Sequence, residues 1–377
     1  MIRLHTPDIS ELEEQAVQNA LRSGWVSTAG PQVNEFEKKL SDFTGSPFVV
    51  AFNSGTAALQ IALITSGVTP GDIVLVPDLC YIATLNAIHH AGAVPLLMEV
   101  NEMDGQMDVA VLEKFLESES TEKNGRCIHS LTGKKIAAIV PLWAWGNSCD
   151  IEKIKILADT YHLELIEDAA AGIGTRSGNK HAGTFGKTGI LSFNGNKILT
   201  TGGGGALLTA DNSIAQLAQH LSVQAKVPGP DYVHDQQGFN NRMTNLSAAL
   251  GIAQMERLTV FLERKKQIFA IYQSEIEKVE QVSVFPGLTS KGGNGWLFQI
   301  RCDYPQKLQD FLKSKDIETS RIWTPMSELK MNSALMRFLP EQNAQKLFSS
   351  VLCLPSSSSL QNTEMEQVIE GVKRFFN

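Results

Sequence analysis

The chain has 377 residues, 43% of them hydrophobic and 19% charged, which suits one large domain with a smaller one and excludes global disorder. A formal net charge of −7 without a basic run argues against a general nucleic-acid binder. The longest apolar stretch, residues 136–145, is too short to span a bilayer. We therefore expect neither nucleic acid nor a membrane as a partner.

The N-terminus lacks the apolar region of a signal peptide. The five cysteines are scattered, odd in number and without a CxxC pair, so they predict neither a disulfide framework nor a zinc site. We expect no metal, and a reducing, cytoplasmic setting.

Strand and helix patterns alternate along the first two thirds of the chain. A capping box at Ser10 and Glu13 begins a helix, and Gly24 is placed to end it. Further helices are predicted from residue 53 to Gly67 and at 150–161. Strands are predicted at residues 48–52, 73–76, 94–100, 136–141, 163–166, 189–193 and 206–209. This alternation is typical of βαβ units and predicts an α/β fold with a mainly parallel sheet.

A polar insert at residues 101–135 interrupts the pattern, with one short helix at 109–116 followed by an exposed loop. Residues 246–279 form a long helical pattern, with a break expected near Thr259, that bridges two domains. We place a large domain at residues 1–255 and a small C-terminal α+β domain at 256–377.

Two residues after β-like runs suggest the chemistry. Asp168 follows the strand predicted at 163–166, and Lys197 follows the one at 189–193 and precedes four glycines, residues 202–205. In a pyridoxal phosphate (PLP) enzyme a lysine amine forms a Schiff base with the aldehyde, and a carboxylate keeps the pyridine nitrogen protonated. The alternative for Lys197 alone is a surface lysine in a glycine-rich loop.

A turn from strand to helix, at Ser54, Gly55 and Thr56, is a candidate phosphate site because free backbone N–H groups and the helix dipole favour an anion there. An ordinary N-capped helix is the alternative, and the motif is neither a Walker A loop nor GxGxxG. Ser192 could hold the same phosphate or simply bond to backbone. Tyr81 could stack on a cofactor ring or serve only in packing.

The chain resembles the DegT/DnrJ/StrS sugar aminotransferases over nearly all its length. This family implies fold type I, a large domain with a mainly parallel seven-stranded sheet flanked by helices, and a small C-terminal domain. The motifs that carry the resemblance are Gly24-Trp25-Val26-Ser27, Ser54-Gly55-Thr56-Ala57, Glu167-Asp168-Ala169-Ala170, Gly183-Thr184-Phe185-Gly186, Ser192-Phe193, Lys197, Gly238-Phe239-Asn240, Arg242-Met243 and Leu354-Pro355-Ser356.

The chain is also similar to one branch of this family, which aminates UDP-linked 4-keto sugars for legionaminic acid and bacillosamine synthesis. This similarity lies in the sequences of residues 192–197, 200–205, 224–228 and 234–235 and in the polar insert. The resemblance implies a PLP-dependent transaminase that converts a nucleotide-linked 4-keto-6-deoxy sugar to the 4-amino sugar, with L-glutamate as donor and 2-oxoglutarate as product. The pathway implied is bacterial surface glycan (lipopolysaccharide, O-antigen) or nonulosonic acid synthesis.

The resemblance also implies residue roles. Lys197 would form the Schiff base and shuttle protons, and Asp168 would pair with the pyridine nitrogen. The other cofactor-binding residues would be Gly55, Thr56 and Ser192 on the phosphate, Tyr81 on the ring, Ala171 beside the ring, and Asn240 reaching the phosphate of the neighbouring subunit's cofactor in a homodimer.

Two positions depart from the family pattern. Ala171 stands where Gln, Glu or His usually approaches the cofactor, and Asn241 stands where an aromatic is usual. A sister group of PLP sugar dehydratases has His in place of the lysine, so Lys197 argues for transamination. The alternatives left open are such a dehydratase, a glycine-dependent synthase, a non-catalytic regulatory dimer of the same fold, and, least favoured, a nucleotide-binding module.

Overall fold

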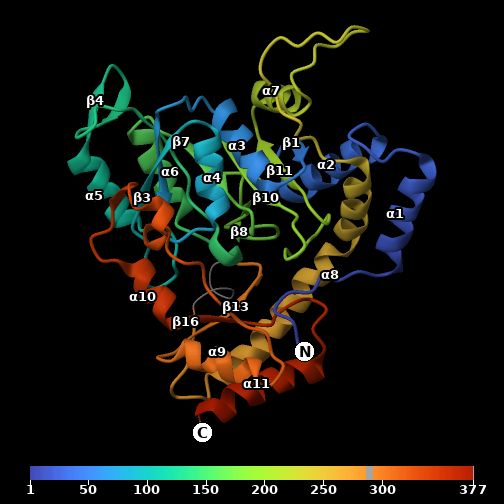
Figure 1. The fold of residues 1–377 in the computed structure, drawn as a ribbon, viewed down its shortest axis with the longest axis vertical. Coiled ribbons are helices and arrows are strands. Elements are labelled where there is room, and N and C mark those ends of the chain that lie inside the picture. The colour runs from blue at the N-terminus through green and yellow to red at the C-terminus, as the bar shows by residue number, and fades with distance from the viewer. Residues whose placement is uncertain (286–291, 377) are drawn as a thin grey trace.

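An eight-stranded sheet forms the centre of the molecule, here described from a computed structural model over residues 1–285 and 292–376 (Figure 1). The strand order is β1-β11-β10-β7-β6-β2-β3-β15, and neighbours are parallel except at β11, which is antiparallel to β1 and β10. The strands are β1 Phe48–Phe52, β2 Ile73–Pro77, β3 Val94–Met98, β6 Ile136–Ile139, β7 Glu164–Asp168, β10 Thr188–Ser192, β11 Gly205–Thr209 and β15 Met336–Phe338.

Both faces of the sheet are buried because helices cover each of them, and successive side chains of a strand point to opposite faces. In β2, Ile73 and Leu75 join one hydrophobic cluster, whereas Val74 and Val76 join the other. The helices α3 Gly55–Thr65, α4 Ile82–His90, α7 Asn212–Ser222 and α10 Asn343–Ser350 contribute to the second cluster. The helices α2 Pro31–Thr44, α5 Val109–Glu119, α6 Ile151–Thr160 and α8 Asn245–Ile276 contribute to the first.

The predicted strands of the sheet are confirmed within a few residues. An eighth strand, β15, comes from the C-terminal part of the chain and pairs in parallel with β3. The polar insert differs from the prediction. After α5 the chain forms a hairpin of β4 Ser120–Lys123 and β5 Arg126–His129 instead of a loop. Asn124 and Gly125 turn it with positive φ angles of 55° and 71°, as a two-residue hairpin requires.

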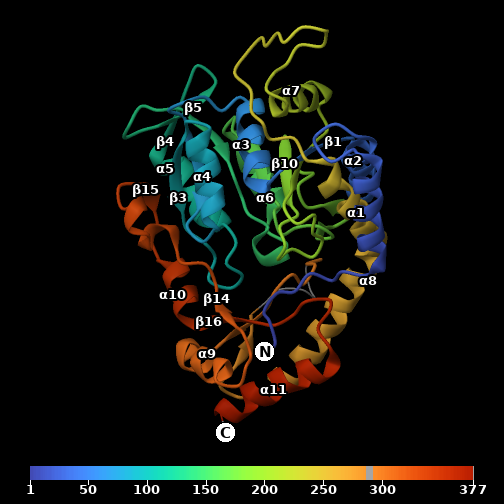
Figure 2. The same cartoon turned by 45° about the vertical axis from the view of Figure 1, so that its right-hand side comes forward.

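The long helix α8 is continuous over 32 residues, so the break predicted near Thr259 is wrong. It passes from the sheet into the C-terminal part of the chain (Figures 1 and 2). Its N-terminal half packs against α1 Glu11–Ser23. There the buried Glu13 side chain accepts hydrogen bonds from Ser10, Gln254 and Arg257. The capping box predicted at Ser10 is confirmed.

The C-terminal part has a sheet and a hydrophobic cluster of its own. Its strand order is β12-β13-β16-β14, all antiparallel pairs. The elements are β12 Ser283–Val284, β13 Phe298–Arg301, β14 Ser320–Arg321, β16 Val351–Leu354, α9 Pro305–Lys313 and α11 Asn362–Phe376. The smaller elements elsewhere are β8 Arg176–Ser177, β9 Lys180–His181, η1 Ala144–Gly146, η2 Met326–Glu328 and η3 Lys330–Asn332. The domain boundary at residue 255 stays a prediction, because α8 runs through it.

A projecting arm, residues 223–240, leaves the body beyond α7 (Figure 1). Single bridges pair Val223 with Asn240 and Lys226 with His234. Most of its residues are exposed, and Tyr232 is 86% exposed, whereas Ala225 is buried. Among the described residues, no helix has the length and apolar character to cross a membrane.

Candidate active site

The carboxyl ends of the parallel strands meet at one edge of the sheet, where α/β proteins bind their ligands. There β1 leads into the turn at residues 53–56, β2 into the loop at 78–81, β7 ends at Asp168 and β10 ends at Ser192. These segments and the loop after β10 surround a cleft of about 350 Å³. The sequence-predicted residues that line it are Gly55, Thr56, Tyr81, Asp168, Ala171, Ser192 and Lys197.

Lys197 lies in a tight turn after β10, where its backbone N–H donates to the Asn194 carbonyl at 2.9 Å. Its amine lies 3.8 Å from the ring centre of Trp296. Burial lowers the pKa of Lys197 to about 8, and the charge of Asp168 acts in the opposite direction. At pH 7 roughly a tenth of the amine is therefore uncharged, far more than for an ordinary lysine, and this uncharged form is the one that acts as a nucleophile and base.

Asp168 is buried at the end of β7. Thr84, in the first turn of α4, donates its hydroxyl to Asp168 Oδ2 at 2.7 Å, and the Ala170 N–H donates to Oδ1 at 3.1 Å. Burial raises the pKa of Asp168, while these hydrogen bonds and the charge of Lys197 hold it down. Such a carboxylate is suited to face a cation in a water-poor cleft.

The start of α3 provides an anion cradle. Ser54 caps the helix by accepting the Ala57 N–H at 3.1 Å, and Gly55 and Thr56, whose N–H groups lie in the first turn and have no acceptor within the helix, line the cleft. Within the described residues, the hydroxyls of Thr56 and Ser192 have no hydrogen-bond partner. A Cβ on Gly55 would lie 2.9 Å from the Cβ of Ser192, so glycine keeps the helix end and this hydroxyl together.

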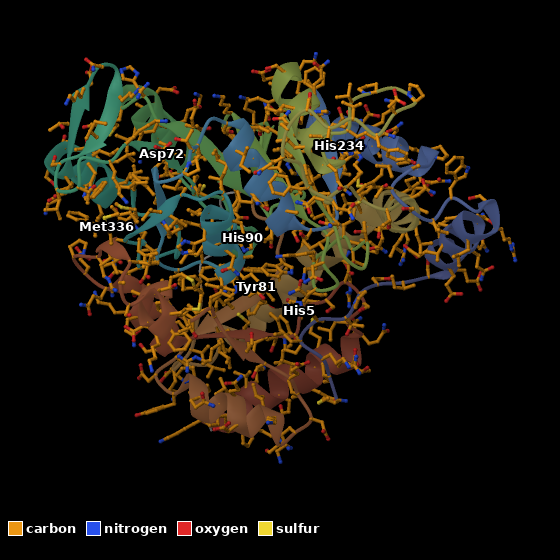
Figure 3. All side chains as sticks on the ribbon, turned by 45° about the horizontal axis from the view of Figure 1, so that its top comes forward. His5, Asp72, Tyr81, His90, His234 and Met336 are labelled. Atoms are coloured by element: carbon orange, nitrogen blue, oxygen red, sulfur yellow. The ribbon has the colours of Figure 1, made fainter. Side chains whose placement is uncertain are left out.

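Tyr81 and Ala171 complete the predicted set. Tyr81 is 58% exposed and lies at the junction between the sheet and the C-terminal part of the chain (Figure 3). Its ring is 6.5 Å from that of Trp323. The buried Ala171 presents only a methyl group to the cleft, and its carbonyl accepts a hydrogen bond from Asn294 at 2.6 Å.

Asn240 lies outside the cleft of its own chain. Its side chain is exposed at the base of the projecting arm, and its carbonyl accepts a hydrogen bond from the Asn53 side chain at 3.3 Å. The role predicted for Asn240, contact with a second subunit's cofactor, stays a prediction.

The sequence did not point to Thr84, Trp296 or Trp323, although all three serve the site. Thr84 could have been found, because a helix starting after Tyr81 places it in the first turn beside the cleft. Trp296 and Trp323 come from distant parts of the chain and carry no motif.

The cleft suits pyridoxal phosphate, since a buried carboxylate, a depressed-pKa lysine and an anion cradle converge in it. In the chain outside residues 286–291 and 377, no three His, Cys, Asp or Glu side chains gather to hold a metal. An α/β sheet with these groups at its carboxyl edge defines a fold-type-I PLP-dependent transferase.

Comparison with known proteins gives the family. The chain matches the DegT/DnrJ/EryC1/StrS aminotransferase family over residues 7–373. It is 33% identical to EpsN of Bacillus subtilis (strain 168) over 382 residues, covering 100% of this chain and 96% of EpsN. It is 31% identical to the GDP-perosamine synthase of Escherichia coli O157:H7 over 384 residues, covering 100% of this chain and 99% of the synthase.

A DegT DnrJ EryC1 StrS aminotransferase from Brucella abortus superposes with a TM-score of 0.89 at 26% identity, covering 97% of this chain and 96% of that one. The chain therefore belongs to the DegT/DnrJ/EryC1/StrS aminotransferase family. It is a PLP-dependent transaminase of the sugar aminotransferase group.

Proposed function

We propose that the protein converts a UDP-linked 4-keto-6-deoxy sugar to the 4-amino sugar, with L-glutamate as amino donor, in bacterial surface glycan or nonulosonic acid synthesis. The motifs similar to the legionaminic acid and bacillosamine branch support this substrate. A GDP-linked keto sugar is the second candidate, because two relatives that match all of this chain at 31% and 32% identity are named GDP-perosamine synthase.

Pyridoxal phosphate, when bound, supplies an aldehyde that exchanges amino groups and a ring that accepts an electron pair. Gly55, Thr56 and Ser192 would hold its phosphate, and Tyr81 would cover its ring. Asp168 would keep the pyridine nitrogen protonated.

Lys197 would hold the aldehyde covalently between turnovers. Displaced by an amino donor, its Nζ atom would be free to act as a base and take the donor's α-proton. Nζ would later give a proton to the sugar carbon that receives the amine. A pKa near 8 suits both directions, because the amine gains and loses a proton at modest cost.

A homodimer with shared sites is part of the proposal. Among the described residues that line the cleft, Lys197 is the one cation, yet the donor and the sugar nucleotide are both anionic. A second copy would bring the exposed Asn240, and Lys226 of the projecting arm, to this cleft.

The five cysteines are free thiols, as a reducing, cytoplasmic setting would leave them.

The observation that carries the proposal is the convergence of Lys197, Asp168 and the α3 cradle on one cleft. The test is to incubate the enzyme with L-glutamate and UDP-, GDP- or dTDP-linked 4-keto sugars, and to identify the products by mass spectrometry. We expect a 4-amino sugar from the UDP-linked substrate. Amination of the GDP-linked sugar alone would select the second candidate. If none of the three nucleotide-linked 4-keto sugars is aminated, the proposal that the substrate is such a sugar is contradicted.

The same assay separates the other PLP chemistry. A sugar dehydratase would release water from the sugar and leave no amino group on it. Loss of mass corresponding to water, without transfer of nitrogen from glutamate, would therefore replace the transaminase proposal.

A further inference from the structure

Trp296 forms the wall against which the Lys197 amine rests. The indole is 5% exposed, and its ring centre is 3.8 Å from Lys197 Nζ. Within residues 1–285 and 292–376, no atom accepts a hydrogen bond from this amine, so the ring face is its closest favourable partner. That distance lies inside the range over which a cation is attracted to an aromatic face.

Trp296 and Lys197 also border a second, smaller cavity of about 20 Å³, which includes His5 and Ser357 in its lining. This is about the space that one water molecule needs. His5 stacks on the indole with ring centres 5.8 Å apart, and it lies beside the junction that Tyr81 marks (Figure 3). The amine thus lies between the main cleft and a polar space behind it.

Hydrogen bonds fix Trp296 to both catalytic loops. Its indole N–H donates to the carbonyl of Asn196, the residue before Lys197, at 2.7 Å. Its backbone N–H donates to Asn294 Oδ1 at 2.9 Å, and the Asn294 amide donates to the carbonyls of Ala171 and Ile173 at 2.6 and 2.8 Å. The ring is therefore positioned by the loop of Lys197 and by the loop that follows Asp168.

A buried lysine on α8 also holds Trp296 in place. Lys265 is 4% exposed, and its amine donates to the Trp296 carbonyl at 2.9 Å and to the Ser356 carbonyl. Burying a lysine beside neutral acceptors costs free energy. Packing alone does not account for a lysine here, because an apolar side chain would fill the same space without that cost. The cost is understandable if the position of Trp296 matters to the reaction.

We propose that the face of Trp296 is the resting place of the Lys197 amine whenever that amine is not attached to the cofactor, which makes Trp296 a positioning residue for transamination. The inference rests on the proposed role of Lys197. Held on the ring, the released amine stays close to the reacting carbons and cannot swing into the smaller cavity. The other charged or titratable groups around this assembly are Asp168, His5, Lys265 and Asp8.

The test measures the free amine directly. The enzyme is loaded with pyridoxamine 5′-phosphate, so that Lys197 is unattached, and is labelled with fluorodinitrobenzene across a range of pH. Mass spectrometry of the Lys197 peptide gives the midpoint pH of labelling. We expect Trp296→Leu to lower this midpoint by roughly half a unit to one unit, because leucine keeps the site buried but gives no cation–π attraction. Trp296→Phe keeps a ring, although one that attracts a cation less strongly than an indole, and should shift the midpoint less than leucine does.

Trp323→Leu is the matched control, because it removes another tryptophan of the same cleft that has no contact with Lys197, and its midpoint should not move. If Trp296→Leu does not fold, fluorinated tryptophan is incorporated instead, since it weakens the ring's attraction for a cation without changing its shape. It should lower the midpoint as leucine does. An unshifted midpoint in the ring-free or fluorinated protein overturns the inference, as does an equal shift in the phenylalanine or Trp323 variant.

A separate measurement tells this failure from failure of the proposed function. Borohydride reduction of the enzyme loaded with pyridoxal phosphate should attach the cofactor to the Lys197 peptide. Attachment elsewhere removes the proposed role of Lys197. Attachment at Lys197 with an unshifted labelling midpoint removes only the inference about Trp296.

Discussion

The hydrogen bond from Thr84 to Asp168 decides how well a buried carboxylate keeps its charge. Burial alone would favour the neutral acid, and a neutral acid could not hold a protonated pyridine nitrogen. The Thr84 hydroxyl, at 2.7 Å, offsets part of this effect. The site therefore depends on a residue that does not itself carry out chemistry.

We predict that Thr84→Val lowers kcat/KM about tenfold or more, because a hydrogen bond to a charged group contributes about 1.5–3 kcal/mol. The pKa of Asp168 should rise further. Since the role proposed for Asp168 needs the ionised carboxylate, the acid side of the pH–rate profile should then move to higher pH. Thr84→Ser keeps the hydroxyl and should preserve the profile. An unchanged acid limb in the valine variant would show that this bond does not control Asp168.

At the scale of residues, the sequence was informative wherever a side chain followed a strand directly. Asp168, Ser192 and Lys197 could be placed because the ends of parallel strands meet at one edge. Trp296 could not, because it reaches Lys197 only through the packing of the C-terminal part against the sheet. The exposed position of Asn240 in one chain leaves its predicted role to be tested in the oligomer.

At the scale of elements, the first turn of α3 is built to approach Ser192 closely. In Gly55→Ala the new Cβ would lie 2.9 Å from Ser192 Cβ and 3.1 Å from its hydroxyl. We predict that the Kd for pyridoxal phosphate rises at least about tenfold, the cost of losing one hydrogen bond to a charged group. Gly195→Ala, which meets no atom within 4 Å, is the control. Equal affinities of the two variants, measured by equilibrium titration, would rule out the cradle.

The contact of α1 with α8 is a second element-scale device. Glu13→Gln should destabilise the protein by about 1–2 kcal/mol, because Glu13 joins the cap of α1 to Arg257. Burial raises the pKa of Glu13, but hydrogen bonds from Ser10, Gln254 and Arg257 lower it overall. The stabilisation is thus present at neutral pH and is lost as the pH falls through the lowered pKa.

The midpoint of urea unfolding measures this effect, with Glu14→Gln, an exposed neighbour in the same turn, as the control that should change stability by less than about 0.5 kcal/mol. If the unfolding midpoints of the wild type and Glu13→Gln differ as much in acid as at neutral pH, the ionic role assigned to Glu13 is contradicted.

Most elements of the large sheet followed from hydrophobic patterning, and the errors have physical reasons. The hairpin at residues 120–129 is short and polar, so the alternation of apolar and polar residues gave no strand signal there. Its Asn124-Gly125 turn was the available signal. The continuity of α8 past Thr259 arises from burial by both parts of the molecule, which outweighs the weak helix propensity of threonine and its β-branched neighbour Val260.

At the scale of the whole molecule, we propose that a second copy of the chain completes the cleft. We predict that Lys197→Ala and Asn240→Ala enzymes are each inactive or nearly so, and that mixing and reassociating their subunits restores about a quarter of the wild-type sites. Half of the random dimers are mixed, and each mixed dimer has one site without a lesion. Activity after mixing that does not exceed that of the separate variants would contradict a shared site.

The most direct measurement is the half-reaction of the enzyme loaded with pyridoxal phosphate, followed by absorbance after addition of L-glutamate. In the wild type, the band of the aldehyde form should disappear as that of pyridoxamine phosphate grows, with release of 2-oxoglutarate. Lys197→Ala should bind the cofactor but show no such conversion on the same timescale. Conversion at the wild-type rate without Lys197 would contradict the central claim, that this amine, paired with Asp168 in one cleft, moves the proton.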